Sequence, residues 1–283
     1  MAFALRIRAN NHEYKRLIAD KIVDLKKAIK SSRELGTKIH KSYDPILASL
    51  CCFFQQISIL SISSKRNTAE QSPRHFFYNN LTFRLKPMGF KHTGLFPEQA
   101  VNWSRMADLI KNAGREISVL NLFGYTGAAS VACVKAGAKV CHVDGAKAMV
   151  ERAGDNLRLS GLEDGMRYII DDCFKFCERE KKRGRKYDAI ILDPPSFGRG
   201  PNGEKWKIEE GISELCELVS DLLSDNPLFV CLNSYTTGLQ PTVMANILKL
   251  TLPATAKIEA DEIGIPTDEG LVLPQGCTAF ATF

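Results

Sequence analysis

The sequence predicts an α/β domain with a doubly wound, mostly parallel sheet, preceded by a basic, helical amino-terminal extension. Between residues 118 and 232, short apolar and β-branched runs alternate with amphipathic segments of helical length. This alternation is typical of a parallel sheet with helices on both faces. Upstream, basic residues greatly outnumber acidic ones, and a polar stretch at 63–73 resembles a linker. We therefore expect an extension over residues 1–75 and the α/β domain over residues 76–283.

The predicted elements alternate in a regular order. Strands are expected at Ser118–Phe123, Lys139–Asp144, Tyr168–Ile170, Asp188–Leu192 and Leu228–Leu232. The helices between them are expected at Ala128–Ala136, Lys147–Ser160, Phe174–Arg183 and Ile208–Leu223. In this architecture ligands bind at the carboxyl ends of the strands, so the residues that follow each strand are the candidates for function.

The charge of the chain is unevenly distributed. Residues 1–91 contain 17 Lys and Arg against 6 Asp and Glu, whereas the remaining residues contain 21 against 26. Apolar residues at helical spacing over 12–30 predict an amphipathic helix with a basic face. Such a face suits a polyanion such as RNA, but a solvated basic helix would have the same composition.

Two further classes of protein are not favoured by the composition. The apolar segment 45–62 contains Gln55, Gln56 and several serines, which favours a packed helix or strand over a membrane span. The nine cysteines lack the paired spacing of a zinc site, and most lie in apolar runs. With no signal-peptide pattern at the start, we expect a reducing, cytoplasmic setting, no metal and no membrane segment. The oligomeric state is left open.

The first predicted strand leads into a glycine-containing turn. Residues Val119–Phe123 are followed by Gly124-Tyr125-Thr126-Gly127 and then by a helix. Glycine permits unusual backbone angles and a close ligand approach, while the free amides at a helix start favour a carboxylate. A purely structural turn would use the same residues.

Acidic residues end the next two strands. Asp144 is placed to accept hydrogen bonds from both hydroxyls of a ribose. The pair Asp171-Asp172, followed by Phe174, suits an exocyclic adenine amine and the face of its ring. Either acid of the pair is equally suited to be a helix N-cap, and for Asp171 this is the simpler role.

The fourth strand is followed by Asp193-Pro194-Pro195-Ser196-Phe197. Two consecutive prolines end both a strand ladder and a helix, so the segment is expected to form a rigid, solvent-facing turn. A structural turn explains the prolines but not the flanking acid and aromatic residue, which favours a functional role.

These motifs together resemble the class I S-adenosylmethionine-dependent methyltransferases, in particular the group related to bacterial large-subunit ribosomal RNA base methyltransferases. The matching segments are Asn121–Gly127, Asp144, Asp172, Asp193–Gly200, the upstream Gly89–Gln99 and the terminal Leu273–Gly276. The resemblance covers about residues 76–283 and implies a seven-stranded, Rossmann-like sheet and S-adenosylmethionine as cofactor. Residues 1–75 do not match the RNA-binding domain or amino-terminal strands of relatives.

The resemblance also implies a role for individual residues. Lys91, Thr93, Phe96 and Gln99 would line the methionine end of the cofactor, above a turn of Asn121, Phe123, Tyr125 and Gly127. Asp144 would hold the ribose and Asp172 the adenine amine. The catalytic segment Asp193, Pro194, Pro195, Ser196 and Phe197 would face the methyl group and the acceptor. For Lys91 and His92, a basic surface loop is the plainer interpretation.

One departure from the family bears on mechanism. Relatives that methylate carbon 5 of cytosine carry a nucleophilic cysteine in a loop after the fifth strand. Here that loop reads Asn233-Ser234-Tyr235-Thr236-Thr237-Gly238, and the nearby Cys231 lies in an apolar run typical of a buried thiol. The sequence thus predicts direct methyl transfer, without a covalent enzyme–base bond.

We therefore expect a methyltransferase that acts on a base in ribosomal or other structured RNA. The residues leave open a protein or small-molecule acceptor, and also a catalytically silent RNA-binding module. A dinucleotide-dependent oxidoreductase would have the G-x-G-x-x-G turn, which residues 124–127 lack.

Overall fold

The computed structural model describes residues 74–85, 93–199, 203, 205–266 and 271–283. The predicted basic helix at 12–30, the apolar segment 45–62 and the linker at 63–73 lie outside these residues. The chain divides into two compact units, of which one comprises residues 73–86, 94–263 and 275–283 and the other comprises residues 1–72, 87–93 and 264–274. The first of these units holds the sheet and the site described below.

A seven-stranded sheet forms the centre of the domain, with the strand order β10-β11-β9-β6-β3-β4-β5. The four neighbouring pairs from β9 to β5 are parallel, and β11 is antiparallel to β9. The strands are β3 (Ser118–Leu122), β4 (Lys139–Asp144), β5 (Met166–Ile170), β6 (Ala189–Leu192), β9 (Phe229–Ser234), β10 (Lys257–Pro266) and β11 (Val272–Thr282). The predicted class I methyltransferase fold is confirmed.

All nine predicted elements are present, most within one or two residues of their expected bounds. The third strand begins two residues earlier than predicted, and the helix expected to reach Leu223 ends at Ser220. The sequence analysis missed the helix before the first strand and every element after β9, together with two small hairpins. One of these hairpins begins within the Asp193–Gly200 segment.

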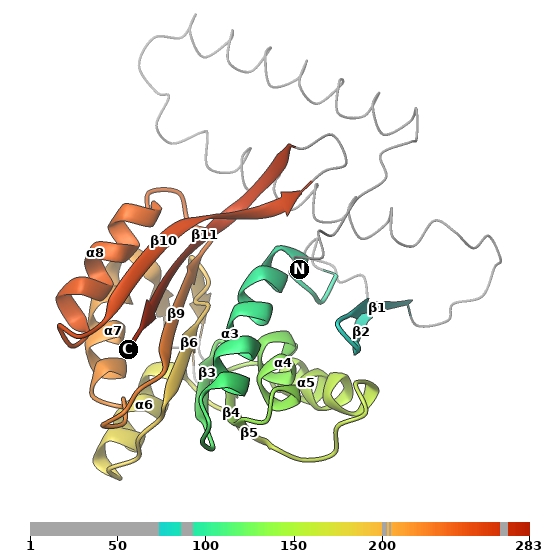
Figure 1. The fold of residues 1–283 in the computed structure, drawn as a ribbon. Helices are drawn as coiled ribbons and strands as arrows, with labels where there is room; N and C mark the ends of the chain where they lie inside the picture. Colours follow the sequence, from blue (N-terminus) through green and yellow to red (C-terminus); the bar gives the residue numbers. More distant parts are fainter. Residues whose placement is uncertain (1–73, 86–92, 200–202, 204, 267–270) are drawn as a thin grey trace, which may run out of the picture. The chain divides into compact units, whose positions relative to one another are not determined.

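Helices cover both faces of the sheet, as Figure 1 shows. On one face α3 packs against α4 and α4 against α5, while on the other α6 packs against α7 and α7 against α8. Their bounds are α3 (Ala100–Asn112), α4 (Ala128–Lys135), α5 (Lys147–Leu159), α6 (Cys173–Lys182), α7 (Ile208–Ser220) and α8 (Pro241–Thr251). The central strands are buried on both faces, which explains why they are continuous apolar runs in the sequence.

The core on the α6–α8 face is largely apolar, with one buried carboxylate: Glu180 of α6 accepts from the Tyr187 hydroxyl. Alternate residues of the central strands point into it, among them Leu120, Leu122, Ile190 and Leu192, and meet side chains such as Phe176 of α6. On the opposite face four strand positions are polar and buried: Asn121, His142, Asn233 and Thr278. Buried polar side chains of the sheet are therefore concentrated on the face that lies below the turn after β3.

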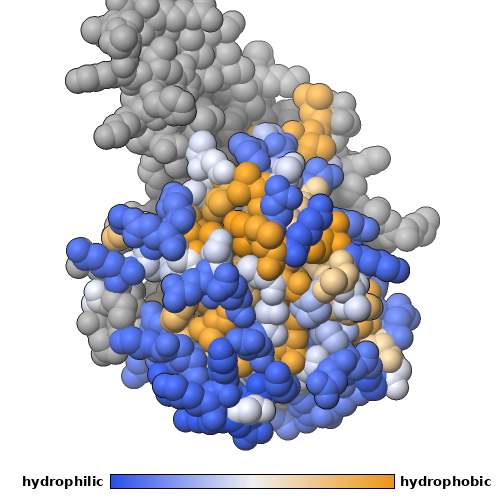
Figure 2. Space-filling model, turned by 90° about the vertical axis from the view of Figure 1, so that its left-hand side faces the viewer, coloured by the Kyte–Doolittle hydropathy of each residue, from blue (hydrophilic) through white to orange (hydrophobic). Residues whose placement is uncertain are grey.

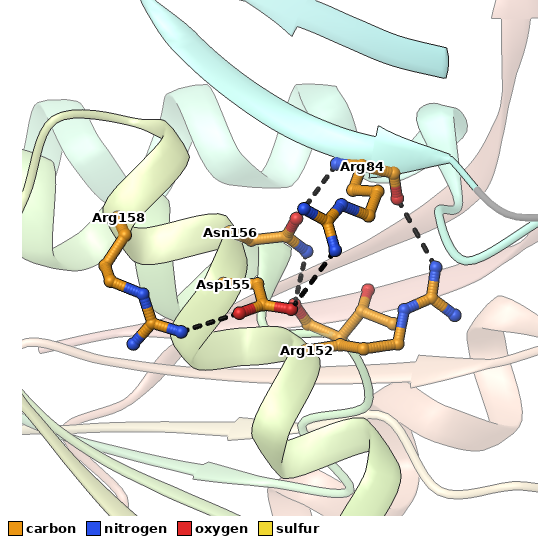
Figure 3. Close-up of polar contacts among 6 residues, drawn as sticks. Arg84, Arg152, Asp155, Asn156 and Arg158 are labelled. Atoms are coloured by element: carbon orange, nitrogen blue, oxygen red, sulfur yellow. Dashed lines mark hydrogen bonds and ion pairs between the residues drawn. The ribbon is translucent and has the colours of Figure 1, made fainter. Parts of the chain in front are cut away.

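A short hairpin before the sheet is fixed to α5 (Figure 3). It consists of β1 (Arg74–Tyr78) and β2 (Leu81–Leu85), paired antiparallel. The Asn156 side chain of α5 accepts a hydrogen bond from the Arg84 amide (2.9 Å) and donates one to the Thr126 carbonyl (2.8 Å). One buried amide side chain therefore connects the hairpin to the turn that follows β3.

Apolar and charged side chains are mixed on the side of the molecule where α7 and α8 lie, which Figure 2 turns toward the viewer. On α8 the apolar residues Met244 and Leu248 face the core, whereas Leu250 is 86% exposed. No helix of the described residues is both long and apolar enough to cross a bilayer.

Replacing Asn156 should destabilise the fold more than replacing its neighbour Asp155. Asn156→Ala leaves two backbone groups without partners, and we expect a loss of about 2–4 kcal/mol in the free energy of unfolding. Asp155→Ala removes only half-exposed ion pairs with Arg84 and Arg158 and should cost less than about 1 kcal/mol. Urea denaturation of both variants measures the difference, and equal losses would contradict the assigned role of Asn156.

Candidate functional site

A pocket lies at the carboxyl ends of the central strands, where the chain order reverses between β3 and β6. Doubly wound sheets bind their ligands at this switch point. The pocket encloses about 470 Å³, including open solvent at its mouth. Its walls come from the segment before α3, from α3, from the turn after β3 and from the ends of β6 and β9. The lining residues are Leu95, Phe96, Gln99, Trp103, Met106, Asn121, Phe123, Gly124, Tyr125, Thr126, Gly127, Ala128, Ala129, Ile191, Asp193 and Asn233.

The turn between β3 and α4 has an unusual backbone. Phe123, Tyr125 and Gly127 have φ angles of 54°, 50° and 82°, all in the left-handed region. Non-glycine residues rarely adopt this region, and each costs about 1–2 kcal/mol there. Four amides of the turn already have partners: those of Phe123, Gly124, Tyr125 and Gly127 donate to Cys173, Val143, Asp144 and Gly124. The surrounding structure must stabilise this conformation.

Packing beneath the turn explains both of its glycines. A Cβ atom on Gly124 would lie 2.3 Å from Cε1 of His142, and one on Gly127 would lie 2.6 Å from the Cβ of Ala153. The turn therefore lies directly on the His142 ring and on α5. Gly124 is required by this contact as much as by any ligand, which the sequence analysis did not anticipate.

A buried polar chain supports the turn from below. Asn121 donates from Nδ2 to Oγ of Ser130 (2.8 Å), and this hydroxyl lies 2.9 Å from Nδ1 of His142. A hydroxyl has one hydrogen and two lone pairs, so Ser130 either donates to Nδ1 or accepts from it, depending on the tautomer of the ring. Burial lowers the pKa of His142 to about 4, so the ring stays neutral at physiological pH.

Asp144 closes the turn from the end of β4. One carboxylate oxygen accepts from the Tyr125 amide and the other from the Ala146 amide, each at 2.8 Å. Burial raises the pKa of this carboxyl group, and the two amide hydrogen bonds counteract that rise. Each oxygen retains a second lone pair, so the carboxylate is able to accept further hydrogen bonds.

The two acids after β5 have different partners. Asp172 is the N-cap of α6 and accepts from the Lys175 amide (2.9 Å). Asp171 forms an ion pair with Arg179 and accepts from the Asp172 amide. The expectation that Asp171 caps this helix is therefore wrong, because the cap position falls one residue later. Only one Asp172 oxygen takes part in the cap.

An aromatic and amide cluster forms the opposite wall of the pocket. The ring of Phe96 lies between those of Tyr125 and Tyr235, with centroids 5.5 Å away in each case. Gln99 donates from Nε2 to the Tyr235 hydroxyl (2.8 Å), and its Oε1 accepts from Asn102 (2.8 Å). These contacts join the segment before α3 to the loop after β9.

The amide of Asn102 extends this cluster into the sheet. Its Nδ2 also donates to Thr278 (2.8 Å), whose hydroxyl donates to Oδ1 of Asn233 (2.7 Å). Asn233 lines the pocket at the end of β9. All three side chains are buried, so the end of β9 is held by a fully buried polar network.

Asp193 follows β6 and lines the pocket on the side away from Asp144. Its withdrawal from water, with a further contribution from the carboxylate of Glu98, raises its pKa to about 7. A carboxyl group in this range is able to exchange a proton near neutral pH, as general acid–base catalysis requires.

The residues after Asp193 point outward as expected, with one exception. Pro194 is buried, whereas Pro195, Ser196 and Phe197 are exposed, Phe197 at 54%. The Ser196 hydroxyl lies 2.6 Å from that of Thr236, so this segment is tied to the loop after β9. Phe197 also begins a small strand, β7 (Phe197–Arg199), which pairs with β8 (Lys205–Lys207).

Cys231 lies within β9 and is fully buried. Burial raises the pKa of its thiol far above the usual range, and the nearby Asp193 carboxylate raises it further. A nucleophilic cysteine requires the opposite shift. The prediction of a buried structural thiol is confirmed, and the other cysteines of the described residues are also unbridged.

The structure brings together much of the predicted site. Phe96, Gln99, Asn121, Phe123, Tyr125, Gly127 and Asp193 line one pocket, while Asp144 supports its turn. Asp172 and residues 194–197 are not among the lining residues. Lys91 lies outside the described residues, and Thr93 belongs to the other compact unit. The assigned roles remain predictions.

Sequence reasoning missed several residues of the site, namely Glu98, Asn102, Trp103, Asn233 and Tyr235. Buried polar residues in α3 and at the end of β9 were a possible signal, but the contacts of Gln99 with Tyr235 and of Asn102 with Asn233 each span more than 100 positions. Within the described ranges, no group of three His, Cys, Asp or Glu side chains is arranged to hold a metal ion.

Comparison with known proteins identifies the family. Residues 71–248, more than half of the chain, match the family model of S-adenosylmethionine-dependent methyltransferases. The chain belongs to this family. Its cofactor is therefore S-adenosylmethionine, and the pocket residues fit such a group: the start of helix α4, a carboxylate at the end of β4 and an aromatic wall are present.

Solved structures and curated relatives are consistent with this assignment. A methyltransferase from Agrobacterium tumefaciens is 32% identical with a TM-score of 0.72, covering 77% of this chain and 72% of that one. Over 148 residues the chain is 34% identical to ribosomal RNA large subunit methyltransferase K/L of Shewanella frigidimarina, covering 51% of this chain and 20% of the relative. Over 152 residues it is 34% identical to ribosomal RNA large subunit methyltransferase I of Serratia proteamaculans, covering 53% and 37%. The chain thus spans between a fifth and just over a third of these two curated relatives.

The raised pKa of Asp193 predicts a pH-dependent stability. The folded methyltransferase keeps the Asp193 proton up to about pH 7, whereas the unfolded chain loses it near pH 3.8, so ionisation destabilises the fold as the pH rises between these values. Between pH 5 and pH 8, wild type should lose roughly 2–3 kcal/mol relative to Asp193→Asn.

Urea denaturation at the two pH values measures this difference in the free energy of unfolding. The exposed Asp225 provides the control, because Asp225→Asn should follow the wild type at both pH values. An equal change in the free energy of unfolding of wild type and Asp193→Asn between the two pH values would show that the fold does not perturb the pKa of this carboxyl group.

Proposed function

We propose that this methyltransferase methylates a base in large-subunit ribosomal RNA, by direct transfer from S-adenosylmethionine. The observation that carries the proposal is the convergence of the left-handed turn and Asp193 on one pocket. The substrate class is supported by the relatives, which are named as ribosomal RNA large subunit methyltransferases. The basic composition of residues 1–91 is compatible with a polyanionic substrate.

The cofactor would bind along the carboxyl edge of the sheet. The methionine end would occupy the pocket against Phe96 and Gln99, with its carboxylate at the start of α4, where Ala128 and Ala129 line the pocket. The ribose hydroxyls would donate to the remaining lone pairs of Asp144, and the adenine amine to Asp172. Thr93 and Lys91 are proposed to complete the methionine end.

The acceptor would approach from the Asp193–Phe197 side. Phe197 is exposed beside the pocket, and an exposed ring offers a stacking surface for an RNA base. The carbonyls of a rigid Pro-Pro segment and the Ser196 hydroxyl are able to accept or donate hydrogen bonds that orient the acceptor. A single rigid loop would thus hold the base in line with the methyl group.

When bound, S-adenosylmethionine supplies an electrophilic methyl group on a sulfonium. A nitrogen or oxygen lone pair of the base forms the new bond to this carbon while the carbon–sulfur bond breaks and its electron pair stays on sulfur. Asp193 would orient the acceptor and take up any proton it releases, a role for which a pKa of about 7 is well suited. Cys231 has no part in these steps.

The proposal predicts a missing modified nucleoside in cells that lack this gene. Large-subunit RNA from a deletion strain and from its parent is digested to nucleosides and compared by mass spectrometry. One methylated base should be absent in the deletion strain and should return when purified enzyme and S-adenosylmethionine are added to the RNA. Identical nucleoside profiles would reject large-subunit RNA as the substrate, whatever the activity toward other acceptors.

Direct transfer predicts opposite outcomes for two substitutions at the end of the sheet. Cys231→Ser should retain most of the activity and lose about 1–2 kcal/mol of stability, because a buried thiol is exchanged for a hydroxyl. Asp193→Ala should lower the methylation rate by roughly a hundredfold, since the acceptor loses its orienting carboxylate.

Single-turnover assays on unmodified RNA compare the two variants, with circular dichroism to verify folding. A folded Cys231→Ser enzyme without activity, together with a covalent adduct on RNA containing 5-fluorocytosine, would restore the cysteine mechanism and contradict direct transfer.

A further inference from the structure

Trp206 connects the two halves of the proposed site. Its indole Nε1 donates a hydrogen bond to the carbonyl oxygen of Pro195 (2.7 Å), in the segment assigned to the acceptor. Its ring lies beside that of Phe123, with a centroid distance of 5.5 Å and an interplanar angle of 43°. Phe123 is the first left-handed residue of the turn assigned to the cofactor. One side chain therefore contacts both loops.

Two elements fix the position of Trp206. It lies in β8, where it pairs with Gly198 of β7, so its backbone is held against the chain that leaves Pro195. A Cβ atom on Gly211 would lie 2.7 Å from Cζ3 of the indole. The ring thus occupies the space that the missing side chain of Gly211 leaves on α7. Because α7 is a core helix with Ile208 and Leu215 fully buried, this support is rigid.

The glycine at position 211 is not explained by the helix itself. Gly211 lies inside α7 and does not have a positive φ. Glycine in a helix interior is less favourable than alanine, because its backbone loses more conformational freedom. The close contact with Trp206 is the structural reason for a glycine at this position.

We propose that Trp206 is a positioning residue that couples the cofactor turn to the acceptor loop. The inference rests on the proposed placement of cofactor and acceptor. Methyl transfer requires the acceptor atom in line with the methyl group, so the distance between these two loops has to be set accurately. The N–H group fixes the acceptor side through Pro195, and the ring supports the cofactor side through Phe123.

Substitutions at positions 206 and 211 test separately the hydrogen bond of the Trp206 N–H group and the support that its ring gives to Phe123. Trp206→Phe keeps an aromatic ring but removes the donor, so kcat should fall about three- to tenfold while the affinity for S-adenosylhomocysteine stays within about twofold. Gly211→Ala keeps Trp206 but displaces its ring, so both kcat and S-adenosylhomocysteine affinity should fall, each by at least about threefold. Combining the two substitutions gives the smaller phenyl ring room beside the added methyl group and should restore the affinity.

Calorimetric titration with S-adenosylhomocysteine measures the affinity, and steady-state methylation of unmodified large-subunit RNA measures kcat. Ser213→Ala is the matched control, because it places an alanine at an exposed position of the same helix and should behave as wild type in both assays. Thermal denaturation of each variant verifies that it is folded. Gly211→Ala should not weaken the helix through its helix propensity, because alanine is a better helix former than glycine.

An unchanged kcat in Trp206→Phe would overturn the role of the N–H group. Unchanged S-adenosylhomocysteine affinity in a folded Gly211→Ala protein, or a loss that Trp206→Phe does not restore, would overturn the role of the ring. The titration does not involve RNA, so a wild type that binds S-adenosylhomocysteine and leaves large-subunit RNA unmethylated rejects only the proposed substrate.

Discussion

The turn between β3 and α4 is the constraint on which the rest of the site depends. Its left-handed residues are unfavourable in isolation, and they are held by contacts from three directions. His142 and Ala153 pack beneath the glycines, and Asp144 accepts from the Tyr125 amide. Asn156 holds the Thr126 carbonyl and connects the turn to the β1–β2 hairpin. The hairpin and α5 thereby contribute to a site that they do not line.

Two titratable groups near the pocket have opposite pKa shifts with a common cause. Burial lowers the pKa of His142 and raises that of Asp193, so both groups favour their neutral forms. Their effects on stability oppose each other between about pH 4 and pH 6.5. As the pH falls through this range, the tendency of His142 to take up a proton destabilises the fold. As the pH rises through it, the tendency of Asp193 to lose its proton destabilises the fold.

The separation of roles between the two sides of the pocket also has a physical basis. On the β4 side, carboxylates accept from backbone amides and are tied into turns and caps. On the β6 side, burial and the Glu98 carboxylate both raise the pKa of Asp193. The segment after Asp193 is largely exposed. The first arrangement suits binding and the second suits proton exchange. Burial of Cys231 beneath Asp193 leaves no accessible thiol at this position of the site.

The sequence by itself determined the doubly wound fold, the order of its central elements and part of the pocket, because strand and helix periodicity and the residues that follow each strand are local properties. Asp144, Asp193 and the turn at 123–127 were found in this way. The tertiary structure alone decided which distant groups meet there. Asn102 with Asn233, Gln99 with Tyr235, Gly124 with His142 and Trp206 with Phe123 are pairs whose members carry no local signal for each other. Their contacts arise from packing across the sheet, and packing depends on the whole fold rather than on any single segment.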